Sequence, residues 1–225
     1  MDEEDEDIDF SEELEEGLVP AIKRWYSDNE LRIVIVEGYQ GVGKSLYALL
    51  TASEIYKTWN WEILRKSFAY DPEELLRTIR RKRERSPLLI WDDAGNWLNN
   101  QDYKNRWVKE TAKYFQVART DFSCIMLTTV DAEDIVKSIR TMNNRILVQI
   151  LRNSSKKEPD RRKARIYTRW KSPDKKRQGE ENKIEEEFYF HHCDWNCYKQ
   201  YEAYRKSFAK KATNKMLKYM DQAGK

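Results

Sequence analysis

The chain has 225 residues, of which 36% are charged and 40% are hydrophobic, and its formal net charge is +3. This length buries one good core with room for a small appendage, and no apolar run approaches the roughly 20 residues that cross a bilayer. Three cysteines are too few and too scattered for a disulfide framework, and the acidic first residues are unlike a secretory signal. We therefore expect a cytoplasmic protein that has no membrane partner.

Charge is distributed unevenly along the chain. Residues 2–16 carry eleven acids and no base, so the rest of the chain has a net charge of +14. Such a block is usually a solvated segment, and we assign residues 1–17 as an acidic disordered tail. The alternative is an intramolecular mimic of nucleic acid, which covers a basic surface until a polyanion displaces it.

Strand and helix patterns alternate along residues 18–151, which we assign as the core. Apolar, β-branched runs predict strands at residues 32–36, 67–70, 87–93, 124–127 and 146–150. Helices are predicted at residues 18–27, 45–58, 71–85, 102–120 and 131–142. This alternation predicts an α/β fold of three layers with a mostly parallel five-stranded sheet.

The segment between the first strand and the second helix is a phosphate-binding loop. Residues 38–45 read Gly-Tyr-Gln-Gly-Val-Gly-Lys-Ser, the pattern G-x-x-x-x-G-K-[ST]. Its glycines let backbone N–H groups approach phosphate oxygens, and the following helix N-terminus favours anions. Lys44 is expected to reach the β- and γ-phosphates, and Ser45 to ligate Mg²⁺. The predicted ATP-binding residues are Gly38, Gln40, Gly41, Val42, Gly43, Lys44, Ser45 and Leu46. The alternative is a glycine-rich turn that matches by accident.

Two adjacent aspartates follow the apolar residues of the third predicted strand. Asp92 has the Walker B position and is expected to hold Mg²⁺ together with Ser45. Asp93 has the position of a carboxylate that polarises the attacking water, although glutamate is commoner there. Glu37 and Asp71 are the alternatives for that base. The alternative interpretation of the aspartate pair, with no catalytic role, is a solvated turn.

Two further catalytic roles are assigned to residues at the ends of later elements. Thr128 or Thr129, at the tip of the fourth strand, is placed to sense the γ-phosphate, and we assign Thr129. An arginine supplied to a neighbouring subunit would stabilise transition-state charge. We assign Arg140 in preference to Arg119 and Arg145, which implies a homo-oligomer. The alternative for all three arginines is a surface ion pair.

An extra strand-and-helix unit at residues 67–85 lies between the loop and the Walker B strand. It favours the P-loop NTPases with an added central strand, the AAA+/ASCE type, and a sheet order of 5-1-4-3-2. The Asn-Lys-x-Asp motif expected of GTPases does not occur in the sequence.

The pattern changes after the core. Residues 152–178 hold twelve Lys or Arg against three acids, and we assign 152–190 as a basic excursion in which a strand at 165–170 pairs with 187–190. Arg152–Gln178 and the helical segment Arg77–Arg85 are the predicted DNA-binding surfaces; the alternative is a solvated loop. Residues 191–225 are assigned as a C-terminal helix and tail, with a helix at 194–219.

Two details of the last segment carry alternatives. His191, His192, Cys193 and Cys197 invite a zinc site, but their cramped spacing favours Asp194 as a helix cap with Cys193 packed behind it. The aromatic stripe of the last helix is interpreted as core or as a partner interface rather than a cofactor site.

The run of residues 89–98, Leu-Ile-Trp-Asp-Asp-Ala-Gly-Asn-Trp-Leu, resembles the Walker B region of a P-loop ATPase family of crenarchaeal spindle-shaped viruses and related plasmids. That family is often described as similar to the bacterial replication initiator DnaA. The loop followed by Tyr47-Ala48 and the strand ending in Thr128-Thr129 are similar too. So is a tail helix that contains Trp195, Tyr198, Tyr201, Tyr204 and Arg205.

The resemblance implies a Mg²⁺-dependent ATPase that acts on DNA in replication or maintenance of a viral or plasmid genome, in the host cytoplasm. It carries over only residues 38–45 and the Asp92-Asp93 pair; the acidic leader and the basic excursion depart from the family pattern. Alternatives are a DNA-packaging or transfer motor, a kinase, and a nucleotide-gated interaction protein with weak hydrolysis.

Overall fold

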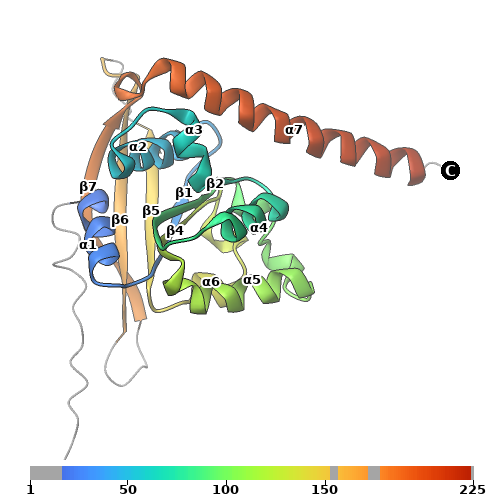
Figure 1. Ribbon diagram of the computed structural model, residues 1–225, viewed down its shortest axis with the longest axis horizontal. Coiled ribbons are helices and arrows are strands. Elements are labelled where there is room, and N and C mark those ends of the chain that lie inside the picture. The colour runs from blue at the N-terminus through green and yellow to red at the C-terminus, as the bar shows by residue number, and fades with distance from the viewer. Residues whose placement is uncertain (1–16, 153–156, 172–177, 224–225) are drawn as a thin grey trace, which may run out of the picture.

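A mixed seven-stranded sheet forms the centre of the molecule (Figure 1). The structure is a computed structural model that describes residues 17–152, 157–171 and 178–223. The acidic block at 2–16 lies outside the described residues, so both interpretations of it remain predictions.

The sheet has the order β2-β3-β4-β1-β5-β6-β7. Its parallel strands are β1 Arg32–Glu37, β2 Phe68–Ala69, β3 Ser86–Trp91, β4 Phe122–Thr128 and β5 Arg145–Arg152. Two antiparallel strands, β6 Arg161–Lys171 and β7 Gln178–Tyr189, continue the sheet beyond β5. A mostly parallel α/β sheet is therefore confirmed. The predicted count of five strands is wrong, because the basic excursion extends the sheet; β5, β1, β4, β3 and β2 are neighbours within the longer order.

Helices cover both faces of the sheet, and each face has its own apolar core. One face carries α1 Leu18–Ser27, α2 Lys44–Tyr56, α3 Trp61–Leu64 and the start of α7 Trp195–Ala223. The other carries α4 Pro72–Arg81, α5 Arg106–Val117 and α6 Lys137–Arg140. Side chains of β1 alternate between them: Val34 and Val36 face α2, while Ile33 and Ile35 face the opposite core.

Three predicted helices are shorter than expected. The helix predicted to reach residue 85 ends at Arg81, because Lys82 is extended and Arg85 binds the backbone carbonyls of Tyr26, in the last turn of α1, and of Glu30. The helix predicted from residue 102 begins at Arg106, where the Asn105 side chain caps it. The helix predicted at 131–142 is only a 3₁₀ turn and α6, because Ile135 is extended and bridges to Asn99.

The hairpin after β5 also differs from the prediction. Arg165 pairs with Glu185, so the strands predicted at 165–170 and 187–190 are not partners. Both strands are longer than expected, and alternating Lys/Arg and Glu residues face each other across the ladder, which favours this register.

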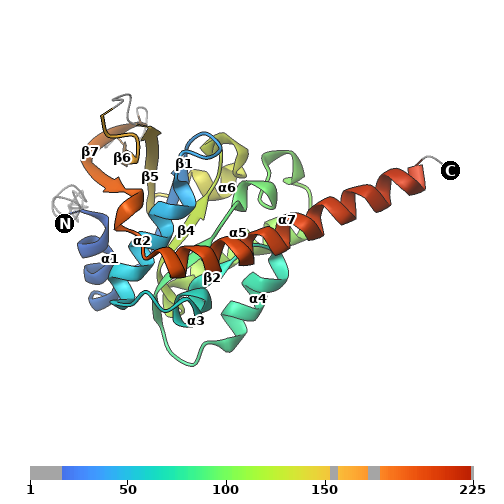
Figure 2. The ribbon, with the colours of Figure 1, turned by 90° about the horizontal axis from the view of Figure 1, so that it is seen from above.

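Seen from above, helix α7 lies across the molecule, and its C-terminal part extends beyond α4 (Figure 2). The Oδ1 atom of Asp194 accepts a hydrogen bond from the Cys197 backbone N–H at 2.7 Å, which confirms Asp194 as the cap of α7. Among the described residues, no helix is long and apolar enough to cross a membrane.

Candidate functional site

The phosphate-binding loop joins β1 to α2 and has the conformation that its glycines permit. Gly38 has φ +146°, and a Cβ atom there would lie 2.8 Å from the carbonyl oxygen of Ile150. Gly43 has φ +112° and precedes the first residue of α2. Lys44 is 7% exposed, and its Nζ donates to the carbonyls of Gly38 at 2.6 Å and Tyr39 at 3.1 Å. Burial lowers the pKa of Lys44, and the nearby aspartates oppose that shift.

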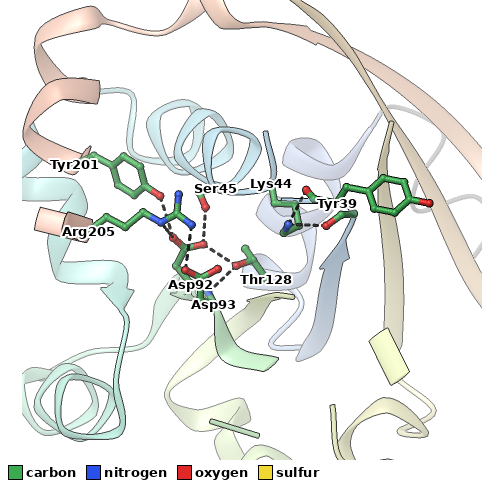
Figure 3. A network of polar contacts seen from close by, with 9 residues as sticks. Tyr39, Lys44, Ser45, Asp92, Asp93, Thr128, Tyr201 and Arg205 are labelled. Atoms are coloured by element: carbon green, nitrogen blue, oxygen red, sulfur yellow. Dashed lines mark hydrogen bonds and ion pairs between the residues drawn. The ribbon is translucent and has the colours of Figure 1, made fainter. Parts of the chain in front are cut away.

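Asp92 is the centre of a buried polar network at the carboxyl end of β3 (Figure 3). It is fully buried, and its Oδ1 accepts hydrogen bonds from Ser45 Oγ at 2.8 Å and Thr128 Oγ1 at 2.6 Å. Its Oδ2 accepts a third bond, from the Tyr201 hydroxyl at 2.9 Å. The loop, β3, β4 and α7 therefore all meet at this one carboxylate.

Asp93 turns the chain away from β3 in a left-handed conformation, with φ 54° and ψ 34°. Asparagine and aspartate tolerate this region better than other side chains with a Cβ atom. The conformation still costs free energy, so it persists only where surrounding contacts fix it. Here the Asp93 N–H donates to Thr128 Oγ1 at 2.8 Å, and the carboxylate accepts from Arg205 at 3.2 Å. Burial, and then the charge of Asp92, raise the pKa of Asp93, while Arg205 and Lys44 oppose the shift.

A cavity of about 450 Å³ opens beside this network. Its lining includes loop residues Gln40, Gly41 and Gly43, the start of α2, and the turn after β3. Helix α7 closes the opposite side with Tyr198, Tyr201 and Arg205, and Phe190 contributes from the turn before α7.

Most of the predicted nucleotide-binding residues line this cavity, but Gly38 and Val42 are not among its lining residues. Gln40, Gly41, Gly43, Lys44, Ser45 and Leu46 line it, as do Asp93 and Thr129. Gly38 and Val42 support the loop from behind; Val42 is 3% exposed. Thr129 Oγ1 donates to the Asp131 carbonyl at 3.0 Å, whereas its neighbour Thr128 contacts Asp92. The structure thus separates the two threonines: Thr128 contacts the Asp92 carboxylate, and Thr129 lines the cavity.

The remaining predicted catalytic residues lie elsewhere. Arg140 is on α6, where it pairs with Glu133 at 2.6 Å, and it does not line this cavity. Arg145 pairs with Glu180. Asp71 accepts from the Glu74 N–H at 2.8 Å as the cap of α4, and Glu37 accepts from the Ala132 N–H at 3.1 Å. Asp93 is therefore the carboxylate that the structure places beside Asp92 and the loop.

Among the described residues, three of the predicted DNA-binding cations of the hairpin pair with acids. Lys163 and Arg165 both bind Glu185, at 2.7 and 2.5 Å, and Arg161 binds Glu158 and Glu187. Arg162 is buried and donates to the carbonyl of Val42 in the loop at 2.9 Å. Part of the hairpin therefore contacts the loop between β1 and α2, which the prediction of a basic excursion missed. Residues 153–156 and 172–177 lie outside the described residues.

In the second predicted DNA-binding segment, Arg77–Arg85, some cations have partners within the chain and others are exposed. Lys82 binds the Asp121 carbonyl, Arg85 binds several backbone carbonyls, and Arg77 pairs with Glu73 at 3.1 Å. Arg80, Arg81 and Arg83 are exposed.

The described residues contain no group of three or more His, Cys, Asp or Glu side chains that could hold a metal ion. His191 pairs with Asp160, and the thiols of Cys193 and Cys197 are buried. Burial raises the pKa of Cys193 to about 12 and that of Cys197 to about 11. At neutral pH these thiols are therefore protonated packing groups.

Sequence reasoning missed the contribution of α7. Tyr198, Tyr201 and Arg205 follow one another at intervals of three and four residues, so they share one helical face. The interpretation of the aromatic stripe as core is confirmed for Tyr201, which is buried, and Tyr198 packs against the same core. What it missed is that Tyr198, Tyr201 and Arg205 also line the cavity. The signal in the sequence was an arginine that continues a run of aromatic residues on one face of a helix.

Comparisons with known proteins place relatives of the chain in viruses. It is 30% identical over 148 residues to the uncharacterized protein B-251 of Sulfolobus spindle-shape virus 1, a match that covers 60% of this chain and 56% of the relative. It is 36% identical over 107 residues to the uncharacterized protein ORF286 of Acidianus two-tailed virus, covering 45% and 37%. The chain thus spans about half the length, or less, of these curated relatives. No family model matches it.

A solved structure with partial similarity is the genome packaging NTPase B204 of Sulfolobus turreted icosahedral virus 2 in complex with ATP-gammaS. The match has a TM-score of 0.36 and 10% identity, and it covers 69% of this chain and 98% of the other. A similarity at this level carries no argument about the site. The chain therefore has relatives in crenarchaeal viruses. Its resemblance to a DnaA-like family remains a prediction.

Proposed function

We propose that the protein binds Mg·ATP in the cavity beside the phosphate-binding loop and hydrolyses it. The observation that carries the proposal is the 2.8 Å hydrogen bond between Ser45 Oγ and Asp92 Oδ1, two residues 47 positions apart in the chain. Parallel strands bring the loop after β1 and the carboxylate after β3 to the same edge of the sheet. A glycine-rich turn that matches the pattern by accident does not predict a hydrogen bond between Ser45 and Asp92.

The groups at this point suit a magnesium ion. Ser45 and Asp92 offer only oxygen atoms, which Mg²⁺ prefers, and they already lie within hydrogen-bonding distance of each other. Held by Ser45 and Asp92, Mg²⁺ would neutralise part of the charge of the triphosphate. Three hydroxyl donors fix the Asp92 carboxylate, so the chain supplies a site that needs little reorganisation.

The remaining residues divide the work of holding the triphosphate and activating water. Loop N–H groups and the start of α2 bind phosphate oxygens, and Lys44 adds a cation. Asp93 is the proposed general base, since its raised pKa brings it closer to the pH at which a base works well. Arg205 is a positioning residue that holds the Asp93 carboxylate.

Two assignments extend beyond this cavity. Thr129 remains the proposed γ-phosphate sensor, supported by its place in the cavity lining. Arg140 remains the proposed arginine for a neighbouring subunit, because it is on α6 and outside this chain's own cavity. This second role requires a homo-oligomer.

We also propose the class of P-loop NTPase to which the protein belongs and the process that its ATP hydrolysis drives. The position of β4 between β1 and β3 supports the ASCE type of P-loop NTPase, and AAA+ membership is a narrower prediction within it. ATP hydrolysis would drive the packaging, replication or maintenance of the DNA of a viral or related genome. The viral relatives and the exposed arginines around the end of α4 support this proposal.

The test is Lys44→Ala, with the exposed Lys23→Ala on α1 as the matched control. Lys44→Ala is expected to lower phosphate release from ATP by about 10²- to 10³-fold, the usual cost of one transition-state donor, and to keep the fold by circular dichroism. Turnover should be measured with and without single- and double-stranded DNA, over a series of protein concentrations that detects assembly.

Several results would contradict parts of the proposal. Unchanged turnover in Lys44→Ala, or no heat when Mg·ATP is titrated into the wild type, would refute the site. Transfer of phosphate to an acceptor other than water would indicate a kinase. Tight ATP binding with negligible turnover, even with DNA present, would indicate a nucleotide-gated interaction protein.

A further inference from the structure

Part of the cavity lining is aromatic, whereas the lining formed by Lys44, Asp93 and Arg205 is charged. Phe190 and Tyr198 line the cavity together with Gly43 and Leu46. A Cβ atom on Gly43 would lie 3.5 Å from Phe190 Cζ, so the Phe190 ring lies directly against the loop. The Tyr198 ring is stacked on Trp195, with centroids 5.6 Å apart and planes at 12°. Trp195 itself is 61% exposed.

Phe190 is held in place by the hairpin. The guanidinium of Arg162 lies over its ring, 4.7 Å from the centroid, and the same side chain donates to the Val42 carbonyl at 2.9 Å. Arg162 therefore ties the ring and the phosphate-binding loop to one another. A ring fixed in this way loses little conformational freedom when a flat ligand stacks on it.

The direction of α7 relates these two parts of the cavity lining. Arg205 contacts Asp93, and Tyr201, one turn earlier, contacts Asp92. Tyr198 lies one further turn back, about 10 Å along the helix from Arg205 at 1.5 Å per residue. One face of α7 thus runs from the carboxylates to the aromatic part of the lining. A nucleoside triphosphate has the same polarity, with a polyanion at one end and an aromatic base at the other.

We propose that Phe190 and Tyr198 form the base-binding subsite, in which the base of a nucleoside triphosphate stacks on these two rings. This inference rests on the proposed function, because it requires the triphosphate to occupy the loop. Stacking discriminates little between bases, since every base offers a π-face. The subsite is therefore expected to accept nucleoside triphosphates with different bases, and GTP should bind within about tenfold of ATP.

The test compares ligands with and without a base. Calorimetric titrations with Mg·ATP, Mg·GTP and Mg·tripolyphosphate are made on the wild type, Phe190→Leu and Tyr198→Leu; leucine keeps much of the apolar volume. Each variant is expected to lose roughly 5- to 100-fold in affinity for ATP, the range of one base–aromatic stack. Affinity for tripolyphosphate should not change. Tyr103→Leu, at an exposed tyrosine outside the cavity, is the control.

A second measurement needs no variant: etheno-ATP, whose base is fluorescent, should be quenched when it binds the wild type. Equal losses for ATP and tripolyphosphate in both variants would overturn the inference, because the rings would then only support the loop. Unchanged ATP affinity in both variants, or unquenched binding of etheno-ATP, would overturn it too. In each of these cases tripolyphosphate still binds the wild type; failure of that binding would instead refute the proposed function.

Discussion

The parallel part of the sheet and the C-terminal extension contribute to one cavity in different ways. Strands β1, β3 and β4 supply the loop, the aspartate pair and Thr128, all at the carboxyl ends of the strands. The extension of β6, β7 and α7 supplies Arg162 behind the loop and Tyr201 and Arg205 over the carboxylates. The first set follows a recognisable motif, and the second does not.

The two regions also treat their charges differently. Lys163 and Arg165 of the hairpin pair with a glutamate across the strands, whereas Arg162 turns inward toward the loop. Arg205 is 47% exposed, but its guanidinium reaches the aspartates. Exposed pairs contribute little to stability, but a buried arginine such as Arg162, which binds backbone carbonyls, is costly to remove. The comparison therefore predicts that single arginines of the extension matter for the site while their neighbours do not.

The largest effect is expected from Arg162→Ala, which breaks the link between hairpin and loop. Arg162 is 7% exposed, and it donates to the carbonyls of Val42 and Pro159, at 2.9 and 2.7 Å. Truncation leaves these acceptors without their donor and creates a cavity, at a cost of about 2–4 kcal/mol. Urea denaturation should show this loss, and the affinity for Mg·ATP should fall because the loop loses a support.

The neighbouring residue is the matched control. Arg161 points outward and pairs with Glu158 and Glu187, so Arg161→Ala should leave the denaturation midpoint and ATP affinity nearly unchanged. Arg162→Lys keeps the charge but not the planar fork, and should be intermediate. Equal behaviour of the two alanine variants would contradict the assignment of Arg162 to the site.

A smaller effect, with a distinct pH dependence, is expected from Arg205→Ala. Burial and Asp92 already raise the pKa of Asp93, and Arg205 opposes them, so its loss raises that pKa further. A raised carboxyl pKa means that stability is highest below the ordinary value of about 4 and falls as pH rises toward the raised value. The variant should therefore lose more stability at pH 7 than at pH 4.

Activity should report the same shift. Because Asp93 must be ionised to act as a base, the acidic limb of the pH–rate profile should move to higher pH in Arg205→Ala, with turnover lowered about tenfold at pH 7. Lys206→Ala removes the next cation on α7, which pairs with Glu202, and should do neither. A profile that keeps its shape in Arg205→Ala would show that this arginine does not act through Asp93.

The sequence predicted what local patterns determine. Residues 38–45 and the apolar run before Asp92 place the loop and the carboxylate on strand ends, and the α/β alternation predicts the mostly parallel sheet. Helix α1 has the predicted bounds, and Asp71 and Asp194 are caps. Each of these features depends on a few consecutive residues and one period of hydrophobicity.

The remainder depends on distant contacts. The length of the hairpin is set by pairing between Arg165 and Glu185 and their neighbours, whereas the sequence predicted only short strands at 165–170 and 187–190. The helix predicted at 131–142 is interrupted because Ile135 bridges to Asn99, more than thirty residues away. Arg205 reaches the aspartates only because α7 crosses the carboxyl edge of the sheet, and no local pattern encodes that crossing.

The smallest effect concerns the hairpin as a DNA surface. Glu185 holds both Lys163 and Arg165, and these bonds lower its pKa. Glu185→Gln should scarcely change the midpoint of thermal unfolding, because exposed ion pairs contribute little. We expect DNA association to depend on the exposed arginines around the end of α4 instead. Arg80→Gln and Arg81→Gln should each flatten the dependence of log K on log salt by about one.

Charge substitutions are the appropriate test, because deletion of 152–178 would remove β6 and, with it, the Arg162 support of the loop. A loss of DNA binding after such a deletion would therefore not distinguish a missing DNA surface from a damaged nucleotide site. In Glu185→Gln two cations are released from their partner while the strands stay paired. If the hairpin binds phosphates, this variant should associate with DNA more tightly and with a steeper salt dependence than the wild type. Such a result would return the DNA surface to the extension, and an unchanged slope would leave it with α4.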